Sequence, residues 1–143
     1  MRLNSNKYSI ALLAASLLLC TGCKKDRSCD TPIGDATFTI DLRMPSATAL
    51  NDIGGYIYVF GGNKGVCVTH PSANEYNAFE RTCPNDHDTP VEMDEQSGGM
   101  VLRCPKCGDR FLTTDGAPLD GNTSSCNLYQ YSSELDGYLI HVW

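Results

Sequence analysis

The stretch AFERTCPNDHDTPVEMDEQSGGMVLRCPKCGDRFLT, residues 78–113, alternates short apolar segments with two cysteine-bearing loops. The first loop is Cys83-Pro-Asn-Asp-His87, and the second is Cys104-Pro-Lys-Cys107-Gly108. In the second loop two thiolates stand close together, proline fixes φ at the entry, and glycine accepts the positive φ that the exit of a chelating turn requires. Since Cys83 and His87 can supply the remaining ligands, this stretch predicts a metal or iron–sulfur site between two loops of a β domain.

Short apolar segments with a period of two recur from residue 38 onward, and none after the N-terminal leader keeps a helical period. Residues 128–131 and 138–143 flank an Asp136-Gly137 turn signal, which predicts a tight β-hairpin. The other candidate strands are residues 38–44, 55–60, 66–69, 78–81, 100–103 and 110–113. We therefore predict an all-β domain, a small antiparallel sandwich or barrel.

The N-terminal residues are similar to a bacterial lipoprotein signal peptide. Arg2 and Lys7 precede an apolar run at residues 10–19, which is too short for a permanent membrane span. Two small residues then precede Cys23, the predicted lipidation site. A plain secretory peptide and an uncleaved anchor are the alternatives. We expect a signal peptide at residues 1–22 and a membrane-anchored lipoprotein of the bacterial cell envelope, facing the periplasm or the exterior.

Cleavage before Cys23 would leave a tether at residues 23–34 and one domain at residues 35–143. The tether has no apolar periodicity and ends in proline and glycine. Cleavage removes two of the 11 basic residues and none of the 17 acidic ones, so the formal net charge changes from −6 to −8. This charge argues against binding to nucleic acid or to anionic lipid. The lipid is therefore the expected membrane contact.

The order of these features resembles that of the Rieske domain, a small antiparallel β fold with a [2Fe–2S] cluster. In that family a Cys-x-His loop and a later Cys-x-x-His loop hold the cluster. The resemblance covers residues 38–143 and rests on the Cys83-Pro loop, the run from Cys104 to Phe111, Thr114-Asp-Gly-Ala-Pro118 and the closing hairpin. It implies a Rieske-type fold with a cluster-binding hairpin subdomain, a [2Fe–2S] cofactor, electron transfer and a redox protein partner.

Two ligand positions depart from the family pattern. Asn85 stands where the family has its first histidine, and Cys107 stands where it has the second. His87 lies two residues beyond the expected place and can substitute if the loop is reshaped. Neutral imidazoles help to raise Rieske potentials to about −150 to +300 mV, whereas all-thiolate plant-type clusters lie near about −400 mV. A thiolate in place of one imidazole should therefore lower the potential.

Four states of the site stay open at this point. Cys83, His87, Cys104 and Cys107 can hold a [2Fe–2S] cluster or, as a Cys3His set, a closed Zn²⁺ site. Outside the cytoplasm Cys83 can also form a disulfide with Cys104 or Cys107. The fourth state is a scaffold without a cofactor.

Residues that would indicate catalysis are not found in the sequence. It has no convincing pair of carboxylates, no Ser/His/Asp order, no phosphate-binding glycine loop and no nucleotide fingerprint. We expect an electron-transfer or structural module rather than a self-contained catalyst. The alternative function is a non-enzymatic cell-envelope lipoprotein in which a structural zinc ion or disulfide replaces the cluster.

The remaining cysteines and histidines are interpreted as structural. We predict that Cys67 and Cys126 form a buried pair or a disulfide, and that Cys29 in the tether is a free thiol or is oxidised only as an artefact. His70 and His141 are expected in the core or on the surface. Acidic residues crowd the connection between the two ligand loops, which is typical of a solvated hairpin, and selection of a basic redox partner is the alternative.

Overall fold

The structure is a computed structural model that describes residues 29–143. The predicted signal peptide, residues 1–22, and the predicted lipidation site Cys23 lie outside the described residues. Within the described part, no helix has the length and apolar character that crossing a membrane requires.

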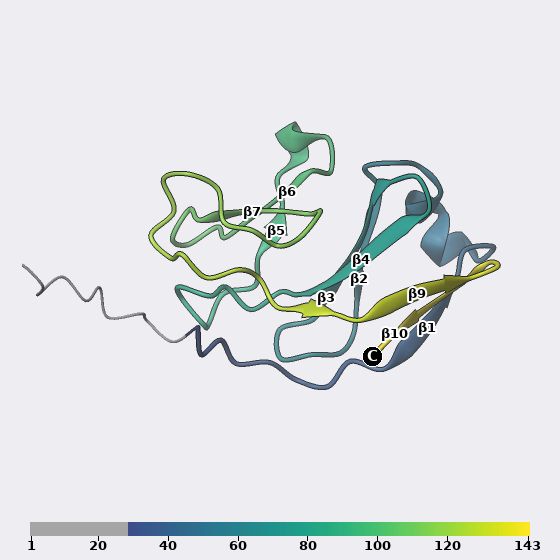
Figure 1. The fold of residues 1–143 in the computed structure, drawn as a ribbon, viewed down its shortest axis with the longest axis horizontal. Coiled ribbons are helices and arrows are strands. Elements are labelled where there is room, and N and C mark those ends of the chain that lie inside the picture. The colour runs from purple at the N-terminus through teal and green to yellow at the C-terminus, as the bar shows by residue number, and fades with distance from the viewer. Residues whose placement is uncertain (1–28) are drawn as a thin grey trace, which may run out of the picture.

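The described residues contain three antiparallel sheets (Figure 1). Their strand orders are β1-β10-β9, β2-β3-β4-β8 and β5-β6-β7. The strands are β1 (Phe38–Asp41), β2 (Tyr56–Val59), β3 (Val66–Ser72), β4 (Glu75–Glu80), β5 (Glu92–Met93), β6 (Val101–Arg103), β7 (Arg110–Leu112), β8 (Gln130–Tyr131), β9 (Ser133–Asp136) and β10 (Leu139–Val142). Two 3₁₀ helices, η1 (Pro45–Asn51) and η2 (Glu95–Ser97), complete the described elements. The prediction of an all-β antiparallel fold is confirmed.

The first two sheets form the larger part of the molecule, which we call the body. Alternating apolar residues of these strands point to one side and share one largely aliphatic core. The opposite faces of β3 and β4 are also buried, and Cys67 and Phe79 pack there in a second cluster. The buried members of the aliphatic core are Ala36, Ile40, Ala47, Leu50, Val66, Val68, Ala78, Tyr131, Ile140 and Val142. The body therefore has a core that is independent of the cysteine loops.

The third sheet forms a smaller lobe, which we call the metal lobe and which spans residues 82–118. In Figure 1 it lies at the upper left, away from β1, β9 and β10. Its strands are only two or three residues long. Its core is formed by buried Phe111 and Leu102 together with Cys83 and Cys104, and it is continuous with Phe79 of β4. Cysteine side chains are therefore part of the packing that holds this lobe together.

The closing hairpin forms at the predicted turn, but one of its strands differs from the prediction. β10 pairs with β9, with Leu139 opposite Asp136, whereas the predicted partner, residues 128–131, contributes β8 to a different sheet. The reason is the buried Tyr131, whose hydroxyl lies 2.8 Å from a carboxylate oxygen of Glu80. The Tyr131 hydroxyl reaches the Glu80 carboxylate only when β8 lies beside β4.

Residues 29–34, which we predicted as part of a tether, lie against the body. The carbonyl of Gly34 is 2.8 Å from the Tyr131 hydroxyl, and the amide of Gly62 donates to the Asp35 carbonyl at 2.9 Å. A Cβ added to Gly34 would come within 2.4 Å of the Gly62 backbone. This close approach explains why a glycine stands where the chain enters the domain.

Candidate metal centre

The first ligand loop connects β4 to β5 and presents Cys83. Thr82 and Pro90 form an isolated bridge at its base, and the Cys83 amide donates to the Thr89 carbonyl at 3.2 Å. The amide of His87 donates to the Cys83 carbonyl at 2.9 Å. The loop is therefore a closed turn whose backbone curls around the Cys83 side chain.

The second ligand loop connects β6 to β7 and presents Cys104 and Cys107. The Cys104 amide donates to the Asp109 carbonyl at 2.8 Å, and the Gly108 amide donates to the Cys104 carbonyl at 3.0 Å. Gly108 has a φ of 82°, the left-handed conformation predicted for the exit of this turn. The chelating turn expected from the sequence is therefore present.

The two loops bring three thiols to one point. The sulfur atoms of Cys83, Cys104 and Cys107 lie within 4.8 Å of one another, and the Cys83 and Cys107 sulfurs are 3.6 Å apart. Cys83 and Cys104 are fully buried, while Cys107 is partly exposed. Three of the four predicted ligands thus converge in an arrangement that can chelate a soft metal ion.

The pKa values of Cys83 and Cys107 shift in opposite directions. Burial raises the pKa of Cys83 to about 12, although the backbone amides of Asp86 and Asn85 hydrogen-bond its sulfur and oppose the shift. Burial also acts to raise the pKa of Cys107, but hydrogen bonds outweigh it and leave that pKa below its usual value. They come from the Asp109 amide, the Asn85 side chain and the two other thiols. Cys107 is therefore the thiolate that neighbouring hydrogen bonds favour when no metal is present.

Side chains at the tips link the two ligand loops directly. The Asn85 side chain of the first loop hydrogen-bonds the Cys107 sulfur of the second. Lys106 of the second loop forms an ion pair with Asp86 of the first. These contacts hold the two loops close to each other. The sequence alone does not indicate these roles of Asn85, Asp86 and Lys106, because their partners lie on the other loop.

His87 does not join the three sulfurs. Its Nε2 atom lies 3.0 Å from the carbonyl oxygen of Pro84, so the ring is turned toward the backbone of its own loop. Among residues 29–143, the group of potential ligand atoms at this point contains the three cysteines without His87. The backbone at His87 is in the left-handed region, with φ of 62°, which is uncommon for a residue other than glycine.

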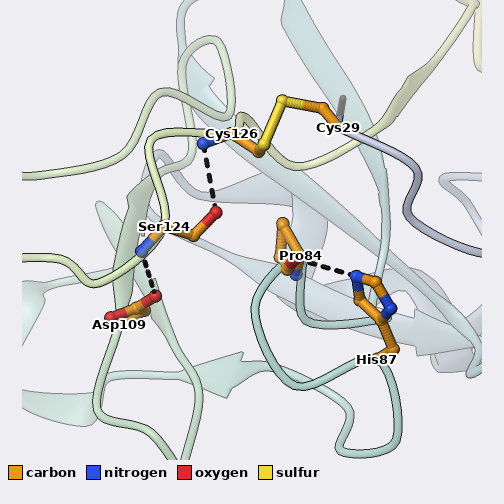
Figure 2. The surroundings of a disulfide bond; sticks show 6 residues. All are labelled: Cys29, Pro84, His87, Asp109, Ser124 and Cys126. Atoms are coloured by element: carbon orange, nitrogen blue, oxygen red, sulfur yellow. Dashed lines mark hydrogen bonds between the residues drawn. A yellow bond between two sulfur atoms is a disulfide. The ribbon is translucent and has the colours of Figure 1, made fainter. Parts of the chain in front are cut away.

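The predicted disulfide between Cys67 and Cys126 is wrong. Cys126 is bonded to Cys29, with a Cα–Cα distance of 5.5 Å, so Cys29 is not the free thiol that we expected (Figure 2). Cys67 stays reduced because it faces the core from β3, between Tyr58 and Phe79 on the neighbouring strands. Burial raises the pKa of Cys67 to about 12, against the opposing charge of Arg81.

The disulfide lies beside the ligand loops and is connected to the second one. The Asp109 carboxylate accepts hydrogen bonds from the amides of Thr123 and Ser124, at 2.7 and 3.0 Å. The Ser124 hydroxyl in turn accepts from the Cys126 amide at 3.2 Å. Figure 2 shows the contacts of Ser124 with Asp109 and Cys126 next to Pro84 and His87 of the first loop. The segment around Cys126 therefore forms a third loop against the metal lobe.

No family model matches the chain, and neither does any curated protein. One similar solved structure is the ferredoxin of carbazole 1,9a-dioxygenase from Nocardioides aromaticivorans IC177. It is 18% identical, with a TM-score of 0.46 over 66% of this chain and 90% of that chain. Similarity at this level assigns no function.

Proposed function

We propose that this protein is a Rieske-like metal-binding domain that transfers electrons when iron occupies its thiol site. The observation that carries this proposal is the convergence of three cysteine sulfurs within 4.8 Å from two closed turns. Soft thiolate ligands select zinc, iron–sulfur clusters and other thiophilic metals over hard ions such as Mg²⁺ or Ca²⁺. The partly exposed Cys107 supports electron exchange, because it leaves the edge of the site accessible to a partner.

The proposal includes a place in the cell and a kind of partner. The leader that precedes Cys23 supports a lipid-anchored protein of the bacterial envelope, facing the periplasm or the exterior. A redox protein is the proposed partner. The acidic residues around the first ligand loop, among them Asp88 and Glu92, support a basic docking surface on that partner.

A second candidate function is a structural lipoprotein in which a zinc ion only stabilises the fold. The specific observation in its favour is that Cys83 and Cys104 are part of the metal-lobe core. A Zn²⁺ ion at this place would tie together strands that are too short to hold the lobe by pairing alone.

The test is to purify the mature chain without oxygen, measure iron, zinc and acid-labile sulfide per chain, and record a visible spectrum. The electron-transfer proposal predicts bound iron and a coloured protein that is reversibly bleached by dithionite. Cys104→Ser should lose the metal and the colour. Cys67→Ala, which removes a buried thiol outside the site, is the matched control and should keep both. Zinc without iron would favour the structural function, and no metal would reject both.

A further inference from the structure

We propose that the site binds a single thiophilic divalent ion, such as Zn²⁺ or Fe²⁺, rather than a [2Fe–2S] cluster. Cys83, Cys104 and Cys107 supply three thiolates, and solvent supplies the fourth ligand. The inference rests on the proposed function, because it requires that these thiols bind metal. It departs from the cofactor that the Rieske resemblance implies, and the departure follows from the distances between the sulfur atoms.

The first argument is the separation of Cys83 and Cys107. Two thiolates on one tetrahedral ion, each about 2.3 Å from the metal, have sulfur atoms about 3.8 Å apart. The observed separation is 3.6 Å, and all three sulfurs lie within 4.8 Å of one another. In a Rieske arrangement Cys83 and Cys107 would bind different irons, and the width of the cluster core would lie between them. The observed separation matches ligands of one ion.

The second argument is how the two loops are linked. In the Rieske pattern the position of Asn85 would hold the second iron together with Cys107. Here the Asn85 side chain instead hydrogen-bonds the Cys107 sulfur itself. The ion pair between Asp86 and Lys106 also joins the two loops. The Asn85 side chain is therefore engaged with Cys107, and a second iron would lack the imidazole that the family pattern has at this position.

The third argument is the charge of the site. Three thiolates around a divalent ion leave a net charge of about −1, which backbone amides can offset. The amides of Asn85 and Asp86 hydrogen-bond the Cys83 sulfur, and the amide of Asp109 hydrogen-bonds the Cys107 sulfur. The turns therefore supply donors that offset the negative charge of a single-ion centre.

The fourth ligand is assigned to solvent because, among residues 29–143, no further His, Cys, Asp or Glu side chain joins the three sulfurs. The Nε2 atom of His87 lies 3.0 Å from the Pro84 carbonyl. Within residues 29–143, the group of converging ligand atoms includes neither His87 nor the buried Cys67. Because Cys107 is partly exposed, water can reach the remaining position of the tetrahedron.

The test is to titrate Co²⁺ into the metal-free, reduced mature chain and to follow the thiolate-to-cobalt charge-transfer absorption. The inference predicts saturation at one Co²⁺ per chain. Each of Cys83→Ser, Cys104→Ser and Cys107→Ser should weaken binding at least tenfold, while Cys67→Ala, the matched control, should not. His87→Ala should leave both the affinity and the spectrum unchanged. In parallel, reconstitution with iron and sulfide should yield at most one iron and no acid-labile sulfide.

The outcomes that would contradict the single-ion inference differ from those that would contradict the proposed function. Two irons and two sulfides per chain would overturn the single-ion inference and leave the metal-binding function standing. A cobalt spectrum altered by His87→Ala would overturn the solvent ligand. Failure to bind any metal, in a chain whose circular dichroism shows it to be folded, would overturn both the inference and the proposed function.

Discussion

The body and the metal lobe are built from the same kind of sheet but are held together differently. β3 and β4 of the body pair over most of their length and cover an aliphatic core. The strands of the metal lobe are two or three residues long, and cysteine thiols fill part of its core. Short strands contribute few ladder hydrogen bonds and bury little apolar area. The comparison indicates that the body is stable by packing, while the metal lobe depends on what its thiols bind.

The two regions also differ in the hydrogen bonds that their buried polar groups make. In the body, the fully buried Glu80 carboxylate accepts hydrogen bonds from the amides of Asn63, Lys64 and Thr82 and from the Thr82 hydroxyl. In the metal lobe, the buried Cys83 and Cys104 have mainly weak sulfur hydrogen bonds when no metal is present. A buried carboxylate whose hydrogen bonds are all made holds its surroundings in one structure. Thiols that converge without strong partners instead form a site for an ion.

The largest expected effect comes from removing the metal. Because the ion would join both ligand loops, chelation or Cys104→Ser should expose the amides of β5, β6 and β7 to hydrogen exchange, with rates rising at least tenfold. The amides of β3 should stay protected. Hydrogen exchange followed by mass spectrometry measures both regions at once. Equal protection in the metal lobe with and without metal would remove the distinction between the two regions.

The next effect concerns the disulfide, which ties the start of the domain to the third loop. Cys126→Ser removes the disulfide to Cys29, which joins residues 97 positions apart in the sequence. In the chain-entropy description, a link of this span contributes about 4.7 kcal/mol to the free energy of unfolding. Urea denaturation should show a loss of this order, while metal content stays unchanged. Wild-type protein in reductant is the control and should lose the same amount.

A smaller effect is expected for Glu80→Gln in the body, which places an amide nitrogen against hydrogen-bond donors. We expect a loss of about 2–3 kcal/mol in the free energy of unfolding. Burial acts to raise the pKa of Glu80, but the amides of Asn63 and Lys64 and the hydroxyls of Thr82 and Tyr131 hold it below its usual value. A lowered folded pKa contributes stability above the unfolded value of about 4.3 and loses it as the pH falls through the folded pKa.

Urea denaturation of both chains across pH 3–7 measures this contribution. The difference between wild type and Glu80→Gln should be full near pH 7 and should shrink as the pH falls below about 4.3. Metal content of the variant at pH 7 should equal that of wild type. A difference that grows at low pH would contradict the assigned direction of the pKa shift.

The smallest predicted effect is at the exit of the chelating turn. Gly108→Ala adds a side chain at φ of 82°, where no other atom lies within 4 Å of the new Cβ. The cost is therefore conformational only, about 1–2 kcal/mol. We expect weaker metal binding, by about tenfold, with β3 still protected from exchange. Gly137→Ala, at a φ of 61° in the β9–β10 turn, is the matched control and should leave metal affinity unchanged.

The parts of the fold that depend on local pattern could be predicted from the sequence. Alternation identified most of the strands, and Cys104-Pro-Lys-Cys107-Gly108 identified the turn with its left-handed glycine. The partners of those strands depend on distant residues. Tyr131 lies in β8 beside β4 because its hydroxyl meets Glu80, a contact that no local pattern encodes.

The sequence predicted the three thiols of the site but not the side chains around them. The spacing of the cysteines correctly predicted that Cys83, Cys104 and Cys107 lie close together, since each belongs to a turn of known shape. His87 was counted as a ligand by its position in the sequence, whereas its ring is turned toward the Pro84 carbonyl. The partner of Cys126 is Cys29, 97 residues away, and pairing over such a distance is not encoded in spacing.

The most direct test of a centre formed by three thiolates around one ion is X-ray absorption at the metal edge of the loaded protein. We predict three sulfur scatterers at about 2.3 Å and one oxygen or nitrogen scatterer at about 2.0–2.2 Å, with no metal–metal vector. A short metal–metal distance, or fewer than three sulfur atoms around the ion, would contradict the account.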